Sequence, residues 1–424
     1  ICGVSQHLLS DNQIDETVLD DLTFDETICS TCDHLIRLGG FLALDYSVEP
    51  DSQRVFVVNR TKPSFGLALP LPSFDGSHWL SVRTQHDVRR LLQSEPSNIA
   101  RIYSKNYRAS GLHVSTRLWI GDYNHCDNQE KGAVAFQNFV GLPHGSGVAR
   151  LAVLRADVDD LGQLFVKGIS GGKPNRLMYD TLGRSVALSH SLTRFFRSHI
   201  NRIAEKGRYN LVIVYSGGDD LFAVGWWQDI IDFALDLREA FRSFTGDKLS
   251  LSAGIGFFHH SFPIARMAEI TGQLEKQAKS GQKDQIALFG LESRNDSILC
   301  RHIYTWADFK DQVLVMRDFL IQHLDLDQET SSQAMTGRSF LYKLLGLLNM
   351  PESDQRLSLA RFAYLIARRD PGDNASQKEI DHYQQLRNTL YRWASKKDSR
   401  NQLLTATMLC IYSIRRKGDK SHEL

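Results

Sequence analysis

The segment LVIVYSGGDDLFAVGWW, residues 211–227, restricts the fold of this 424-residue chain more than any other. Two apolar runs flank Gly217, Gly218, Asp219 and Asp220, a pattern that predicts a hairpin of two buried strands. Carboxylates beside buried strands are costly unless they bind a cation or face a cleft. We expect the glycines to give the turn positive φ angles and to let a ligand approach the main chain closely. The turn is therefore a candidate binding site.

From residue 150 onward, strand-like and helix-like segments alternate along the chain. Their order, β-α-β-β-α-β followed by α-β, predicts a ferredoxin-like palm with one added unit in a chain of the α+β class. The predicted strands are 148–160, 211–216, 221–227, 249–259 and 285–290, and the predicted helices are 176–206, 228–244 and 264–281. The first helix has an apolar face formed by Leu182, Val186, Leu192, Phe195 and Phe196.

Composition and patterning divide the chain into four predicted regions. Short alternating runs punctuated by Gly, Pro and Ser predict β structure before the palm, and long apolar repeats predict a helical bundle after it. The regions are a zinc-ribbon-like remnant (1–35), a β-rich segment with a linker (36–147), the palm (148–292) and the C-terminal helical domain (293–424).

The last region carries a local excess of basic residues. Residues 331–424 hold 16 Lys and Arg against 9 Asp and Glu, although the whole chain has a net charge of only +1. A solvated helix surface is one interpretation. A surface for phosphate backbones or for a protein partner is the other.

The cysteines indicate one candidate metal site. Cys29 and Cys32 form a Cys-x-x-Cys pair, which is half of a tetrahedral zinc site, and Cys2 could belong to a second pair. The alternative is two free thiols in a turn. Because the chain does not begin with Met, we expect it to start inside a longer protein.

Acidic residues on separate strands predict a second metal site. Asp157 ends the first palm strand, and in this topology that strand lies beside the hairpin that carries Asp219 and Asp220. Converging carboxylates are the ligands with which phosphoryl-transfer enzymes bind Mg²⁺ or Mn²⁺. Lys279 and Lys283 follow a helix end and could reach a triphosphate.

Four ordered segments resemble the second palm domain of the large subunit of type III CRISPR effector complexes, of the III-A (Csm) kind. The C-terminal helices and the motif ICSTC extend this resemblance over most of the chain. The segments are VLRADVDDLGQLF, VIVYSGGDDLFAVG, LSLSAGIGFFHHSFPIARMAE and AKSGQKDQIALFG.

The resemblance implies a palm that converts ATP into cyclic oligoadenylates when the complex holds a matching target RNA. The expected partners are guide RNA, target RNA, the small subunit and the subunit that binds the guide tag. The residues that it assigns to Mg²⁺ or Mn²⁺ are Asp157, Asp219, Asp220 and the carbonyl of Val158, and those that it assigns to ATP are Ser189 and Lys279. We expect Ser216, Gly217, Gly218 and Lys283 to complete the ATP site.

Members of this family also contain an HD nuclease domain and a first palm, and we find neither in this sequence. The pair His86-Asp87 lacks the further ligands that an HD site needs, and we interpret it as coincidence. Two other functions stay open. One is a diguanylate-cyclase-like enzyme that prefers GTP and forms a homodimer, and the other is a non-catalytic scaffold of a ribonucleoprotein.

The sequence predicts neither a secretory signal nor a membrane span. Its first residues lack a basic region and a long apolar core, and no apolar run approaches the length of a membrane helix. The six cysteines do not form a disulfide framework of the kind found in secreted proteins. We therefore expect a cytoplasmic protein.

Overall fold

The computed structural model divides the chain into two compact units, which are described separately here. The first comprises residues 1–120 and 129–134, and the second comprises residues 121–128 and 135–424. The residues that the structure describes are 54–64, 68–71, 78–106, 115–126, 135–140, 147–167, 181–290, 292–294, 297–324, 326, 332–350, 355–373 and 375–414. Cys2, Cys29 and Cys32, with the predicted ribbon, lie outside these ranges.

The first unit contains a five-stranded sheet in the order β2-β3-β1-β4-β5. Its strands are β1 (Arg54–Asn59), β2 (Ala68–Pro70), β3 (Trp79–Thr84), β4 (Ile99–Lys105) and β5 (Ser115–Leu118). Helix α2 (Gln85–Ser94) buries Val88 and Leu91 completely, and a single turn, η4 (Pro96–Asn98), follows it. The predicted β-rich character is confirmed for the described part of this segment.

The second unit is built on a seven-stranded sheet in the order β14-β11-β10-β7-β9-β8-β6. Its strands are β6 (Asn124–His125), β7 (Leu151–Val158), β8 (Leu211–Ser216), β9 (Asp220–Trp226), β10 (Leu251–Phe258), β11 (Gln285–Phe289) and β14 (Ile303–Thr305). The four central strands are antiparallel, and β11 runs parallel to β10. The ferredoxin-like palm with one added unit is confirmed. Strands β6 and β14, which the sequence did not predict, extend the sheet beyond residues 148–292.

Helices cover both faces of this sheet. They are α4 (Leu161–Lys167), α6 (Leu182–Arg194), the π-helical segment η5 (Phe195–His199), α7 (Ile200–Gly207), α8 (Trp227–Thr245) and α9 (Ile264–Ser280). Leu154 and Ala156 of β7 share a core with α8, so Arg155 and Asp157 point to the opposite face, where Glu275 and Lys279 of α9 contact them. A short helix, α3 (Phe136–Phe139), precedes β7.

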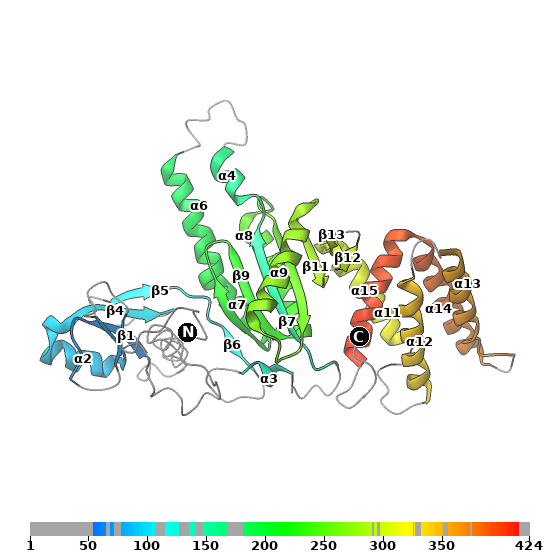
Figure 1. Ribbon diagram of the computed structural model, residues 1–424, viewed down its shortest axis with the longest axis horizontal. Coiled ribbons are helices and arrows are strands. Elements are labelled where there is room, and N and C mark those ends of the chain that lie inside the picture. Colours follow the sequence, from blue (N-terminus) through cyan, green and yellow to red (C-terminus); the bar gives the residue numbers. More distant parts are fainter. Residues whose placement is uncertain are drawn as a thin grey trace. The chain divides into compact units, whose positions relative to one another are not determined.

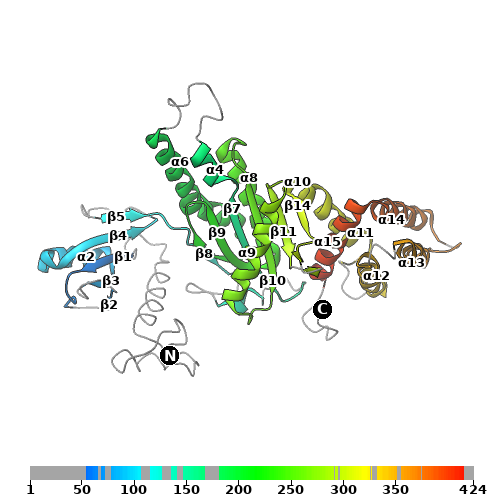
Figure 2. The same cartoon turned by 45° about the horizontal axis from the view of Figure 1, so that its top comes forward.

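The predicted helix 176–206 differs from the observed one in its first half. Leu192, Phe195 and Phe196 are buried as expected, whereas Leu182 is 82% exposed and Val186 is 57% exposed. Figures 1 and 2 show the reason, since α4 and α6 both extend past the end of the sheet. The first turns of α6 therefore have no sheet below them to cover.

Strand β8 is also less buried than the sequence predicted. Val214 and Tyr215 are 47% and 52% exposed. The register with β9 shifts between Ile213 and Tyr215, and β6 pairs only with the first two residues of β8. The end of β8 thus lies at an irregular sheet edge, where apolar residues stay in contact with solvent.

The C-terminal region forms the predicted helical bundle. Its segments are α10 (Trp306–Asp308), the π-helical η6 (Phe309–Leu314), α11 (Val315–His323), α12 (Ser332–Leu348), α13 (Gln355–Ala367), α14 (Gln377–Ser395) and α15 (Lys397–Ile414), after a hairpin of β12 (Glu292–Arg294) and β13 (Ser297–Leu299). Helix α15 packs against α11, α12 and α14. Among the described helices, none is long and apolar enough to cross a membrane.

Candidate active site at the end of the palm sheet

The predicted neighbours Asp157 and the Gly-Gly-Asp-Asp turn lie side by side. Strands β7 and β9 are antiparallel, and their register places Asp157 directly opposite Asp220. The backbone N–H of Val158 donates to the carbonyl of Asp219 at 3.2 Å, which joins the end of β7 to the turn. Directly opposed residues share one face of a sheet, so two carboxylates from separate strands converge here.

The two glycines serve the turn differently from what the sequence predicted. Neither Gly217 nor Gly218 has a positive φ, so that expectation is wrong. At Gly217 a Cβ would lie 2.6 Å from Asp220 Oδ1 and would overlap the hydroxyl of Tyr215, so the ends of both side chains would have to move. At Gly218 the nearest atom would be Thr193 Oγ1 at 3.7 Å, an ordinary contact. Close packing between neighbouring side chains, rather than backbone conformation, therefore restricts position 217.

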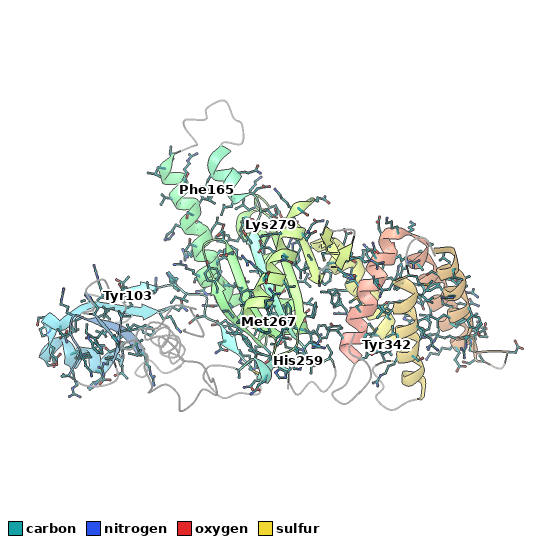
Figure 3. The ribbon with its side chains drawn as sticks, viewed as in Figure 1. Tyr103, Phe165, His259, Met267, Lys279 and Tyr342 are labelled. Atoms are coloured by element: carbon teal, nitrogen blue, oxygen red, sulfur yellow. The ribbon has the colours of Figure 1, made fainter. Side chains whose placement is uncertain are left out.

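Lys279 brings a cation to the acidic residues from the other side of the site. Its Nζ lies 2.7 Å from Asp157 Oδ2 and donates to the Val158 carbonyl at 3.3 Å. Figure 3 shows Lys279 at the end of the palm where Phe165 of α4 lies, away from Met267 and His259. Lys279 thus contacts two of the oxygen groups that the family resemblance assigns to a metal ion.

A second carboxylate holds Lys279 in place. Glu275 lies one helical turn before Lys279 on α9, and its Oε1 is 3.6 Å from the lysine Nζ. Its other oxygen, Oε2, lies 2.8 Å from Arg155 Nε of β7, and its side chain is only 8% exposed. Glu275 and Arg155 were not among the predicted site residues. The signals were present, because i and i+4 residues of a helix are neighbours and alternate residues of a strand share a face.

The electrostatics of the turn reflect this crowding. Burial, followed by repulsion from Asp157 and Asp220, raises the pKa of Asp219, and Lys279 only partly opposes this. Repulsion between the phenolate form and Asp220 raises the pKa of Tyr215, whose hydroxyl donates to that carboxylate. In the described part of the chain, neither Asp219 nor Asp220 has a salt bridge. The turn therefore carries negative charge that its protein neighbours do not neutralise.

The other acidic residues after β7 belong to the scaffold. Asp159 is buried and accepts hydrogen bonds from Ser250 Oγ at 2.8 Å and from the Asp284 backbone N–H at 3.0 Å. Asp160 pairs with Lys283. These contacts join the end of β7 to the loops that lead into β10 and β11. Lys283 therefore lies beside the site, on a loop that Asp159 and Asp160 anchor.

The predicted serines occupy different environments. The Ser216 hydroxyl donates to the Phe196 carbonyl in η5, so it anchors the turn to the helix behind it. Ser189 is exposed on α6, one turn before Thr193, the residue nearest to Gly218. Because residues four apart on a helix share a face, Ser189 lies on the side of α6 that meets the turn.

The chemistry of these donors suits a hard divalent cation, but they do not form a complete metal cage. Among the described residues, no group of three or more His, Cys, Asp and Glu side chains is arranged to hold a metal ion. Mg²⁺ commonly takes only one or two carboxylates and completes its shell with water and substrate phosphates. Asp157 and Asp220, which oppose each other across β7 and β9, supply the number of carboxylates that such a partial site needs.

Comparison with known families identifies this palm. Residues 150–287 match the model of the Cas10/Cmr2 second palm domain, and residues 325–416 match the second helical domain of the CRISPR RNA silencing complex Cmr2 subunit. The chain belongs to the Cas10/Csm1 family of type III-A large subunits. The predicted family is thereby confirmed, and the two matched regions contain the acidic turn and the helical bundle.

Curated Cas10/Csm1 proteins, named as single-strand-specific deoxyribonucleases of subtype III-A, are similar over most of this chain. The Enterococcus italicus protein is 34% identical over 396 residues, covering 92% of the chain and 44% of the relative. The Streptococcus thermophilus protein is 37% identical over 320 residues, covering 75% and 39%. The chain thus spans less than half the length of these relatives.

Solved structures share the fold. The Csm1-Csm4 cassette in complex with one ATP aligns with a TM-score of 0.60 at 20% identity, covering 91% of this chain and 50% of that one. The cassette in complex with cA4 aligns with a TM-score of 0.54 at 22% identity, covering 74% and 44%. At these identities the likeness supports the palm and bundle architecture. The chemistry of the site has to be inferred from this chain's own residues.

Proposed function

We propose that this chain supplies one side of the active site of a metal-dependent nucleotidyltransferase. That enzyme makes cyclic oligoadenylates from ATP within a type III-A CRISPR complex. The observation that carries the proposal is the pairing of Asp157 with Asp220 across β7 and β9, with Lys279 of α9 against Asp157. Family membership supports the same reaction class.

The reaction is attack by a ribose 3′-hydroxyl oxygen on the α-phosphorus of ATP. A new O–P bond forms, the bond from the α-phosphorus to the bridging oxygen breaks, pyrophosphate leaves, and the hydroxyl proton passes to solvent or a nearby base. Asp157, Asp219, Asp220 and the Val158 carbonyl would hold Mg²⁺ or Mn²⁺. When bound, such an ion lowers the pKa of the hydroxyl and neutralises phosphate charge.

Lys279 would orient the triphosphate. An ammonium group has three donors, and those of Lys279 face Asp157, the Val158 carbonyl and Glu275. A metal ion held by Asp157 and the Val158 carbonyl would free two of these donors for phosphate oxygens. Glu275 restricts where that ammonium group lies, since it holds both Lys279 and Arg155. Glu275 is a positioning residue. Its own pKa is raised by burial, an effect that Lys279 opposes.

Other residues would complete the nucleotide site. Ser189 would contact the nucleotide from α6, and Lys283 would contact phosphates from its loop. Gly217 and Gly218 would leave the backbone accessible to the triphosphate, whereas Ser216 would act by fixing the turn to η5. A second palm domain would supply the other side of the active site.

The partners and location follow from the same proposal. Guide RNA and target RNA would reach this chain through the complex, together with the small subunit and the subunit that binds the guide tag. The complex would act in the cytoplasm. Cys2, Cys29 and Cys32 would contribute to a structural zinc site.

The decisive experiment uses the assembled complex with guide RNA, target RNA and Mg²⁺, and compares turnover of ATP with that of GTP. Replacing both turn carboxylates (Asp219→Asn with Asp220→Asn) should lower oligoadenylate output by at least about a hundredfold, as for loss of a main electrostatic element. A matched control, Asp311→Asn with Asp318→Asn, removes two exposed carboxylates of the helical region and should leave output unchanged.

Three results would overturn the proposal. Unchanged output from the turn variant would remove these carboxylates from the reaction. A preference for GTP with a cyclic dinucleotide product would favour a diguanylate-cyclase-like enzyme. Complete absence of nucleotide turnover by the intact complex with target RNA bound would favour a non-catalytic scaffold.

A further inference from the structure

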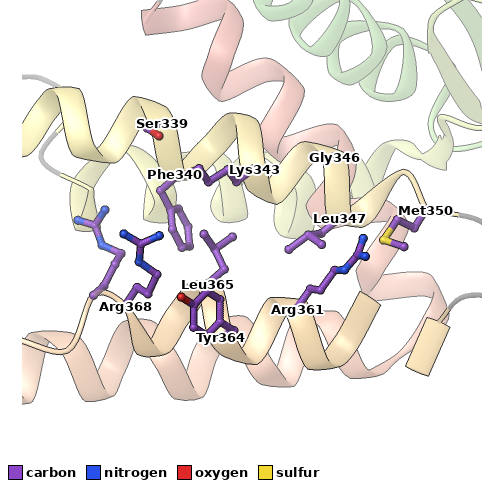
Figure 4. Close-up of a pocket in the computed structure, with 11 residues that line it drawn as sticks. Ser339, Phe340, Lys343, Gly346, Leu347, Met350, Arg361, Tyr364, Leu365 and Arg368 are labelled. Atoms are coloured by element: carbon purple, nitrogen blue, oxygen red, sulfur yellow. The ribbon is translucent and has the colours of Figure 1, made fainter. Parts of the chain in front are cut away.

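A groove of about 580 Å³ lies between α12 and α13 in the helical domain, far along the chain from the palm acids. Figure 4 shows side chains of both helices lining it. Its lining residues are Ser339, Phe340, Lys343, Gly346, Leu347, Met350, Arg361, Tyr364, Leu365, Arg368 and Arg369. The proposed palm chemistry uses none of them.

The charge of this groove is entirely positive. Lys343 comes from α12 and Arg361 comes from α13, whereas Arg368 and Arg369 lie in the turn that follows α13. No Asp or Glu is among the lining residues. Lys343, Arg361 and Arg368 are exposed. Several cations concentrated on one face of a hollow form a site for a polyanion, since each phosphate that is bound releases counterions. Four of the 16 Lys and Arg residues of 331–424 therefore line one groove.

Aromatic rings lie among these cations. The Tyr364 side chain is 65% exposed, an unusual state for an aromatic residue in a helical bundle. The guanidinium of Arg368 lies over its ring at 6.0 Å, and that of Arg369 lies over the buried ring of Phe340 at 5.3 Å. Exposed rings and planar guanidinium groups are the surfaces on which unpaired bases stack.

The groove has a rigid floor. Arg400 of α15 is buried and donates through Nη2 to the Leu347 carbonyl at 2.9 Å and to Ser358 Oγ at 3.0 Å. Ser358 in turn donates to the same carbonyl at 2.9 Å. These bonds fix the end of α12 to α13, so the spacing of the groove walls is set before any ligand arrives, which lowers the entropic cost of binding.

From these features we infer that the α12–α13 groove binds single-stranded RNA. Lys343, Arg361 and Arg368 would contact successive phosphates, and a base would stack on Tyr364. An acidic peptide would satisfy the cations but would leave Tyr364 without a specific partner, and a duplex would present no unpaired base. The choice of RNA over DNA rests on the proposed function, whereas the groove itself does not depend on ATP chemistry.

The test measures fluorescence anisotropy of a labelled oligouridylate of about twelve nucleotides, within the usual span of single-strand sites, titrated with the full chain at several salt concentrations. Arg361→Gln with Arg368→Gln should weaken binding about tenfold and should reduce the slope of log affinity against log salt by about 1.4. The control, Lys378→Gln with Arg392→Gln, removes two exposed cations of α14 and should change affinity less than about twofold.

Stacking is tested separately at Tyr364. Tyr364→Ala should weaken binding about tenfold, and Tyr364→Phe should retain it. Equal losses of RNA affinity in the two charge variants would contradict binding in this groove, because the affinity would then depend only on the overall charge of the protein. Competition by polyglutamate as strong as by RNA, with no effect of Tyr364→Ala, would assign the groove to an acidic protein. Equal affinity for oligothymidylate would overturn the choice of RNA. Because no ATP is present, each outcome is independent of palm activity.

Discussion

The second unit contains two groups of three aspartates that differ in how their charges are satisfied. Asp157, Asp219 and Asp220 meet at the end of the sheet, whereas Asp229, Asp232 and Asp236 lie along one face of α8. On α8, Asp229 accepts from the backbone and side-chain N–H groups of Asn210 at 2.7 and 2.8 Å, and Asp236 accepts from the Tyr209 hydroxyl at 2.7 Å. These bonds fix the chain before β8 to α8.

The three aspartates at the end of the sheet have fewer protein partners. Asp157 has a lysine from another element, and Gly217 leaves room for the Tyr215 hydroxyl beside Asp220. Asp219 and Asp220 have no salt bridge within the described ranges. Clustered carboxylates alone therefore do not identify a site. What distinguishes the turn is that its charges remain available to a ligand, while Asp229 and Asp236 of α8 bind the chain before β8 and burial raises the pKa of Asp232 between them. Four substitutions test whether the two groups of aspartates differ in this way.

The largest effect is expected at Lys279. Lys279→Met should lower oligoadenylate synthesis by the intact complex about a hundredfold, because a charged donor at the phosphates is lost. Lys276→Met, at an exposed position on the same helix, is the matched control and should leave the rate unchanged. Rates measured with saturating ATP and target RNA check this. Equal rates for the two variants would remove Lys279 from the site.

The α8 group should respond in stability instead. Burial raises the pKa of Asp232 to about 6, above the unfolded value of 3.8, so stability falls as the pH rises from 3.8 to 6 and stays lower above 6. Asp232→Asn should therefore stabilise the protein by about 2 kcal/mol at pH 8, and the gain should shrink below pH 6 and vanish at about pH 3, where the aspartate is mostly protonated in both states.

Thermal unfolding of Asp232→Asn across this pH range gives the measurement. Asp373→Asn, at an exposed position before α14, is the control and should show no such pH dependence. Oligoadenylate synthesis should be the same in both variants. A gain in stability that persists at about pH 3, or a loss of synthesis, would contradict the assignment of Asp232 to the fold.

Glu275 should show a smaller, kinetic effect. Glu275→Gln should raise KM for ATP about tenfold with less change in kcat, because Lys279 loses the charge that positions it. Glu275→Asp should recover part of the loss. Glu269→Gln, an exposed position on α9, is the control. A variant that melts earlier but keeps the KM of the parent chain would show that Glu275 is only structural.

The smallest effect separates the two glycines. Gly217→Ala should weaken ATP binding several-fold, since the new methyl group displaces Tyr215 and Asp220, whereas Gly218→Ala meets only Thr193 at 3.7 Å and should bind as the parent does. Adding Tyr215→Ala to Gly217→Ala should restore part of the affinity. Isothermal titration with a non-hydrolysable ATP analogue distinguishes these variants, and similar affinities for both single variants would refute the packing argument.

By itself, the sequence determined the palm topology, the position of the acidic turn between two strands, and the family. Hydrophobic periodicity and strand order are local properties, and they sufficed to predict that Asp157 and Asp220 are neighbours. The roles of Asp157, Asp219, Asp220, Ser189 and Lys283 in binding metal or nucleotide stay predictions, as does the zinc site.

Only the tertiary structure decided what surrounds those residues. The exposure of Leu182 and Val214 depends on where the sheet ends, and the need for glycine at 217 depends on the side chains that pack beside it. The ion pairs that link Lys279 to Glu275 and Asp157 lie where α9 packs against β7, and the basic groove lies where α12 packs against α13. Packing between elements joins residues that are distant in sequence, and local patterns do not encode it.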